Sequence, residues 1–145
     1  MKKIKKIGLD SEKRAAKLVK GELVRGSGCS IFNKGDYETQ EIVYQNKFSS
    51  TGYKLTLKDL NKAKKDGLSK NKDYIFSVEF RGEFFYIFER ILITEEKENK
   101  LKLRSKKFNK GLKLTKRILK DNLLLNDTYI VVGWDDFKNL GLISK

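Results

Sequence analysis

Two apolar segments, residues 73–80 and 83–89, are separated only by Arg81 and Gly82, and this arrangement constrains the fold more than any other feature. Both segments are rich in aromatic and β-branched residues, which favour strands, and a two-residue break containing glycine is typical of a β-hairpin. The chain is therefore predicted to be built on a β-sheet. We expect its aromatic side chains to be packed in a core rather than displayed for stacking on bases, namely Phe80, Phe84, Phe85, Tyr86 and Phe88.

A first helix is predicted over residues 9–23, where apolar residues recur at spacings of three and four. Asp10 or Ser11 is expected to cap its start. Glu12 falls on the same apolar face, and a carboxylate in such a position is costly unless it meets a cation or a metal ion. Glu12 is therefore expected to belong either to an ordinary ion pair with a surface lysine or to a site.

A second helix is predicted over residues 56–66. Thr56 and Asp59 fit the pattern in which a hydroxyl caps the helix start and an acid three residues later caps in return. Gly67 fits the stop signal, because glycine readily adopts the backbone conformation that ends a helix.

Two further strands are expected over residues 28–33 and 40–48, on either side of a Gly-Asp turn at residues 35–36. Successive side chains of a strand point to opposite faces, so Gln45 and Lys47 share one face. Gly-Asp is ordinary turn chemistry, and polar residues also alternate on strands that face solvent. Neither feature marks a site by itself.

Further along the chain, residues 91–95 and 100–104 are expected to pair as strands across the polar segment 96–99. The basic stretch 112–124 is compatible with a helix or with an irregular arm, and the sequence leaves these two alternatives open.

Residues 128–134 predict a buried strand, and Asp135 or Asp136 is expected to cap a short final helix. The chain has no proline, no internal repeat and no Gly/Ser-rich linker, so residues 1–145 are expected to form a single domain. Because helices are interspersed with strands, the expected fold class is α/β, with a central mixed β-sheet flanked by helices.

The chain carries 33 lysines and arginines against 19 acidic residues, a formal net charge of +14. Such an excess points to a polyanionic partner, since neutralising phosphates also releases condensed counterions. Nucleic acid is favoured over an acidic membrane, because no long basic amphipathic helix with a Trp/Phe/Leu face is found. Candidate phosphate contacts, which together predict a steep salt dependence of DNA affinity, are Arg25, Lys106, Lys107, Lys110, Lys113, Lys116 and Arg117.

The single cysteine, Cys29, cannot form an intramolecular disulfide, and the absence of histidine removes the basis for a structural zinc site. The basic N-terminus lacks the apolar core of a signal peptide, and no apolar run is long enough to span a bilayer. We expect a cytoplasmic protein of a bacterial, archaeal or phage-infected cell, with no membrane partner. Without imidazole, catalysis is left to carboxylates, lysines and a metal ion.

Such chemistry could be carried by Glu12, Asp36, Gln45 and Lys47. Phosphodiester hydrolysis without histidine needs hard oxygen ligands for Mg²⁺ and a cation near the attacking water or the developing negative charge. Asp36 and Gln45 can offer oxygens to one metal ion if their strands are neighbours, and Lys47 projects from the same face as Gln45. Glu12 could reach in from a helix packed on the sheet.

The order of these features resembles the PD-(D/E)XK nuclease superfamily: a helix glutamate, Gly-Ser-Gly at 26–28, Lys-Gly-Asp at 34–36 and Gln-x-Lys at 45–47. Within it, the chain is most similar to the small Holliday junction resolvases of archaea and phages. The resemblance runs from Ser11 to Lys47 and continues more loosely to residue 80. It implies a restriction-endonuclease-like nuclease domain, active as a homodimer that cuts two opposed strands of a four-way DNA junction.

By this resemblance Asp36 is the metal-binding acid, Gln45 the second ligand, Lys47 the catalytic lysine and Glu12 the helix glutamate of a site for Mg²⁺, with Mn²⁺ as a possible substitute. Gln45 replaces the glutamate usual in the family, which removes one negative charge and should lower metal affinity. Glu12 is expected to supply the negative charge that Gln45 lacks. The residues expected to contact DNA are Arg25, Ser27, Ser49, Ser50 and Lys54.

Two other functions stay open on the sequence alone. One is a non-catalytic DNA-binding module of the same fold, in which Gln45 marks a lost site. The other is a restriction or repair nuclease that acts on ordinary duplex DNA. Metal titration would separate the first from a nuclease, and comparison of junction with linear substrates would separate the second from a resolvase.

Overall fold

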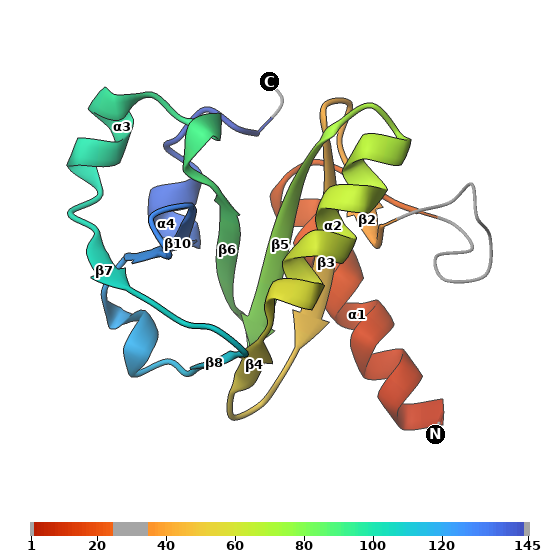
Figure 1. Ribbon diagram of the computed structural model, residues 1–145. Coiled ribbons are helices and arrows are strands. Elements are labelled where there is room, and N and C mark those ends of the chain that lie inside the picture. Colours follow the sequence, from red (N-terminus) through yellow and green to blue (C-terminus); the bar gives the residue numbers. More distant parts are fainter. Residues whose placement is uncertain (1, 25–34, 144–145) are drawn as a thin grey trace.

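The structure is a computed structural model that describes residues 2–24 and 35–143. Its centre is an eight-stranded mixed sheet in which β3 pairs in parallel with β5, and β7 with β9, while the other neighbours are antiparallel (Figure 1). A separate two-stranded ribbon joins β4 (Tyr53–Leu55) to β8 (Leu112–Leu114). In spatial order the large sheet runs β1 (Glu22–Leu23), β2 (Tyr37–Glu38), β3 (Ile42–Phe48), β5 (Asp73–Phe80), β6 (Glu83–Glu89), β10 (Tyr129–Gly133), β9 (Leu123–Leu125) and β7 (Arg104–Lys106).

Helices alternate with the strands along the chain, and two of the helices are long enough to cover a face of the sheet. The helical elements are α1 (Lys2–Leu18), α2 (Leu57–Ser69), α3 (Glu95–Lys100) and α4 (Trp134–Phe137), with 3₁₀ turns η1 (Arg90–Leu92) and η2 (Ile118–Lys120). Within residues 2–24 and 35–143, none of these helices combines the length and the apolar character needed to cross a bilayer.

The alternation of side chains along β5 divides the core into two halves. Ile75 packs with Ala16 and other residues of α1, whereas Phe76 and Val78 pack with Leu60 of α2. The two helices therefore cover opposite faces of the sheet (Figure 1). This arrangement confirms an α/β fold with a mixed sheet flanked by helices.

The hairpin and the second helix are confirmed. β5 and β6 pair in antiparallel register around Arg81 and Gly82, and the five aromatic residues expected in the core are all buried. Thr56 and Asp59 cap α2 reciprocally, as predicted. Gly67 as a stop was wrong, because α2 continues to Ser69 and buries Gly67.

The first helix lies earlier in the chain than expected. α1 begins at Lys2, so neither Asp10 nor Ser11 caps its start, and it ends at Leu18. The apolar face is also shorter than predicted, since Leu9 remains 44% exposed. Of the two upstream strands, residues 28–33 lie outside the described residues, whereas 40–48 contains β3 as expected.

The largest errors fall between residues 91 and 124. Residues 91–95 and 100–104 do not pair, because Thr94 caps the N-terminus of α3 and places the polar segment 96–99 in a helix. The stretch 112–124 is neither a helix nor an irregular arm: it holds β8, η2 and most of β9. The buried strand 128–134 is confirmed as β10, and α4 follows it directly. Its cap is Gly133 rather than either aspartate.

Candidate metal site

A pocket of about 530 Å³ opens where the end of β3 meets the middle of α1. It brings together three of the four predicted catalytic residues, Glu12 from α1, Asp36 from the turn before β2 and Lys47 from β3. The remaining lining residues are Ile7, Gly8, Asn46, Phe48, Ser49 and Ser50. Segments that are far apart in the sequence therefore meet at one opening.

Glu12 and Asp36 are close enough to share a hydrogen bond between their side chains. Partial burial of Glu12, the charge of Asp36 and that hydrogen bond together raise the pKa of Glu12 to about 7, while Lys47 opposes the shift. Below about pH 7 Glu12 is thus mainly protonated and can donate a proton to Asp36. A divalent cation is the natural replacement for such a proton, because it lets both carboxylates ionise.

Asp36 is held by the main chain of the neighbouring strand. The backbone N–H of Asn46 donates to Asp36 Oδ2 at 2.7 Å. The side chain of Asn46, which is buried, donates to Ser11 Oγ and accepts from Ser77 Oγ, both at 2.8 Å. Ser11 precedes Glu12 on α1, so one asparagine sets the position of both acids.

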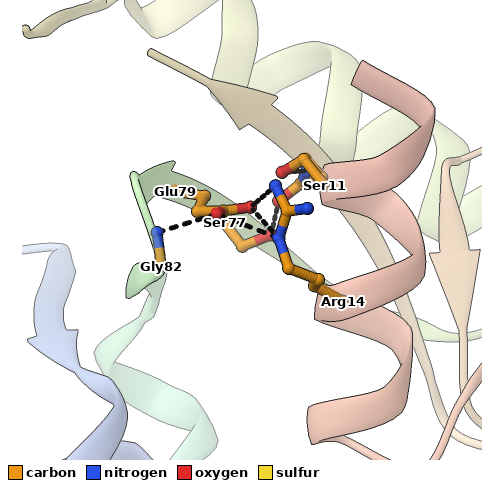
Figure 2. Close-up of polar contacts among 6 residues, drawn as sticks. Ser11, Arg14, Ser77, Glu79 and Gly82 are labelled. Atoms are coloured by element: carbon orange, nitrogen blue, oxygen red, sulfur yellow. Dashed lines mark hydrogen bonds and ion pairs between the residues drawn. The ribbon is translucent and has the colours of Figure 1, made fainter. Parts of the chain in front are cut away.

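A second polar contact beside this network involves a buried carboxylate (Figure 2). Glu79 of β5 is 1% exposed and faces Arg14 of α1, whose Nε and Nη2 donate to it at 3.0–3.2 Å (Figure 2). The backbone N–H of Gly82 donates to the same carboxylate at 2.8 Å. Figure 2 shows this ion pair beside Ser11 and Ser77, so α1 is tied to β5 by two adjacent polar contacts.

Gln45 is the predicted site residue that the structure places elsewhere. It is not among the residues that line the pocket, and its side-chain amide nitrogen donates to Asp66 of α2. Both residues are buried. Asp36 directly precedes β2, and β2 neighbours β3 as required, but the Gln45 amide is bonded on the α2 side. Coordination of a metal ion by the Gln45 oxygen therefore stays a prediction without support from the pocket.

The predicted DNA contacts are spread over different surroundings. Ser49 and Ser50 line the pocket, and the Ser49 hydroxyl is also bonded to the backbone of Gly52. Lys54 is exposed on β4, beyond the pocket lining. Arg25 and Ser27 lie outside the described residues.

The donor set fits Mg²⁺. Two carboxylates supply hard oxygens, and Mg²⁺ is commonly held by one or two carboxylates with water and phosphate oxygens completing its shell. Within the described part of the chain no cluster of three or more acidic or cysteine side chains forms. The pocket thus offers a partial shell of protein ligands and room for a phosphate.

No family model, no curated protein and no solved structure matches this chain.

Sequence reasoning missed Asn46, Ser11 and Ser77 as residues that organise the site. Alternation along β3 places Asn46 on the apolar face of Ile42 and Tyr44, and a polar side chain there signals a buried partner. The partners themselves lie 35 and 31 residues away, so no local pattern could identify them.

Proposed function

We propose that this protein is a metal-dependent, structure-selective DNA endonuclease of the Holliday junction resolvase type. The observation that carries the proposal is the hydrogen-bonded pair of Glu12 and Asp36, next to Lys47, in an open pocket. Two acids and a lysine are the parts that histidine-free phosphodiester hydrolysis needs. The net charge of +14 supports a polyanionic substrate.

In this proposal Glu12 and Asp36 would hold a Mg²⁺ ion, which when bound supplies the positive charge that polarises a phosphate oxygen and activates water. Lys47 would place its ammonium beside the scissile phosphate. Its charge would stabilise the negative charge that grows as the water oxygen bonds to phosphorus and the bond to the leaving oxygen breaks. The exposed Ser50 hydroxyl can donate to a phosphate oxygen at the pocket mouth.

The junction substrate and the homodimer rest on the resemblance of residues 11–47 to resolvases. A two-fold dimer presents two equivalent sites, and a four-way junction offers two equivalent strands. Paired nicks at symmetric positions are therefore the expected product. A restriction or repair nuclease would instead cut linear duplex equally well.

Cleavage of a labelled four-way junction and a matched linear duplex, with and without Mg²⁺, tests this proposal. We expect Mg²⁺-dependent paired nicks confined to the junction, reduced at least about 100-fold by Asp36→Asn or Lys47→Ala. Both variants should still bind the junction. The matched control is the exposed pair Asp135→Asn and Lys138→Ala, which should cut normally. Retained cleavage in either pocket variant would remove its residue from the mechanism.

A non-catalytic DNA-binding module is the second candidate, and the position of Gln45 favours it. With Gln45 bonded to Asp66, the pocket keeps the two acids Glu12 and Asp36 but lacks the amide oxygen predicted as a third ligand. Calorimetric titration with Mg²⁺ and Mn²⁺ separates the candidates. Heat that disappears in Asp36→Asn supports the nuclease, whereas junction binding without any Asp36-dependent metal site supports the module.

A further inference from the structure

Residues 102–120 form the most strongly basic part of the chain. They contain nine lysines and arginines and no acidic residue. Eight of the nine are exposed, and the described residues provide ion pairs at 3.5 Å for Arg104 and Lys116 only. Both of these ion pairs are exposed, and such pairs contribute little to the stability of the fold. The segment therefore keeps most of its positive charge available to a partner.

This segment runs from the outer edge of the large sheet to the β4–β8 ribbon, which lies near the metal pocket. It begins at β7, the last strand of the sheet, and reaches β8, which pairs with β4 (Figure 1). The turn from β3 into β4 contains Ser49 and Ser50, which line the metal pocket. The β4–β8 ribbon is thus one short turn away from the proposed site.

The ribbon has one apolar face and one cationic face. Leu55 and Leu114 are fully buried in the core on the α2 side, and Tyr53 and Leu112 pack against the same core. The intervening residues, Lys54 and Lys113, point to the other face and are directly opposite each other. Like charges in this position destabilise a ribbon, and a two-stranded ribbon is marginal to begin with.

Two glycines lie beneath the lysine stems of this cationic face. A Cβ atom at Gly111 would lie 2.6 Å from Cε of Lys54, and one at Gly52 would lie 3.2 Å from Cε of Lys113. Each lysine stem therefore lies over the glycine that immediately precedes the opposite strand. The result is a surface with two opposed lysines and no side chain at the two glycine positions beside them.

We propose that this face of the β4–β8 ribbon binds the phosphate backbone of a duplex nucleic-acid arm that extends from the metal pocket. The inference rests on the proposed function for what occupies the pocket, but binding by the ribbon needs neither metal nor cleavage. A polyanion offsets the repulsion between Lys54 and Lys113, and the absence of side chains at Gly52 and Gly111 lets a phosphate backbone come close to the lysines. Contacts of this kind carry charge but no sequence information.

The test is fluorescence anisotropy with a labelled linear duplex and a labelled four-way junction, in EDTA, from about 50 mM to about 200 mM salt. We expect Lys54→Gln/Lys113→Gln to weaken binding of both DNAs about tenfold and to reduce the slope of log K against log salt by about 2. The control, Lys100→Gln/Lys138→Gln, removes the same charge from α3 and the end of α4. It should leave the slope nearly unchanged.

An unchanged slope in the ribbon variant, or an equal fall in the control, would overturn the proposal. Salt-sensitive binding to phosphatidylserine vesicles that needs both lysines, with no effect on DNA, would overturn it in favour of a membrane partner. The ribbon variant should melt at or above the wild-type temperature, because it loses a repulsive pair, so weak binding cannot be ascribed to unfolding. Absence of cleavage in Mg²⁺ would count against the nuclease alone.

Discussion

The backbone N–H of Asn46 donates to the carboxylate of Asp36 at 2.7 Å, and the same asparagine bridges α1 and β5 through its side chain. The candidate metal site is thus positioned by β3 itself. Since Asp36 is fixed by main chain and Glu12 follows Ser11 on α1, their proximity depends on how α1 is docked on the sheet. Substitutions that loosen this docking should affect both stability and metal binding.

Asn46→Ala should lower the free energy of unfolding by about 1–3 kcal/mol, because the buried hydroxyls of Ser11 and Ser77 each lose a hydrogen bond to the Asn46 side chain. Urea denaturation measures this directly. The double variant with Ser77→Ala should be less destabilised than the sum of the single variants, since the two residues share one hydrogen bond. Ser105→Ala on exposed β7 is the control and should change stability by less than about 0.5 kcal/mol.

Glu12→Gln should become more stable relative to wild type as the pH rises. The folded-state pKa of Glu12, about 7, is raised from 4.5, so the folded state favours the protonated acid. That contribution is fully present below pH 4.5 and is lost as the pH rises through about 7. The amide is neutral throughout and avoids the loss. Thermal melts in EDTA across this range should show the difference between variant and wild type growing up to about pH 7 and then levelling. A constant difference contradicts this account of Glu12.

Affinity for Mg²⁺ should increase with pH through the same range, because the cation must displace the proton between Glu12 and Asp36. Calorimetry in two buffers of different ionisation enthalpy should detect proton release that is largest below about pH 7 and small above it. Glu12→Gln should bind Mg²⁺ more weakly and without this proton release. Equal proton release in the variant would show that another group supplies the proton.

The sequence predicted elements whose determinants are local. Thr56 and Asp59 specify the start of α2 within four residues, and the β5–β6 hairpin needs only its own apolar segments and Arg81-Gly82. Between residues 91 and 124 the strands are three residues long and pair with distant partners, so charge and turn patterns misled the assignment.

The candidate site was also predicted only in part, because some of its determinants are local and others are distant in the sequence. Glu12, Asp36 and Lys47 could be placed near one another from a helix face, a turn and a strand. The orientation of Gln45 depends on Asp66, which lies 21 residues away on α2. A buried aspartate on α2 is a signal that can be seen only once the buried face of that helix is known.

Arg14→Ala should destabilise the fold by about 1–3 kcal/mol, since it leaves the buried Glu79 carboxylate with one backbone donor. This loss is smaller than for a fully buried ion pair, because the Arg14 side chain is 47% exposed and solvent screens its charge. Arg14→Lys should fall between wild type and alanine, as lysine keeps the charge but lacks the forked donors. Arg104→Ala, which breaks an exposed pair with Asp121, should change stability by less than about 0.5 kcal/mol in the same urea titration.

Gly8→Ala and Gly67→Ala should move stability in opposite directions, although both lie in helices. Alanine is favoured over glycine in a helix interior by about 1 kcal/mol. At Gly8 of α1 an added Cβ meets no atom within 4 Å, so we expect a gain of about 0.5–1 kcal/mol. At Gly67 it would lie 2.8 Å from the backbone oxygen of Lys72 and 3.1 Å from Cβ of Tyr74.

This crowding should outweigh helix propensity and give a net loss of about 1–2 kcal/mol for Gly67→Ala. Gly67 would then be needed for the close approach of α2 to the start of β5, not as a helix stop. Thermal and urea unfolding should be measured for both variants under the same conditions, so that each serves as the control for the other. Stabilisation by both substitutions would show that α2 and β5 are not packed as closely as the structure has them.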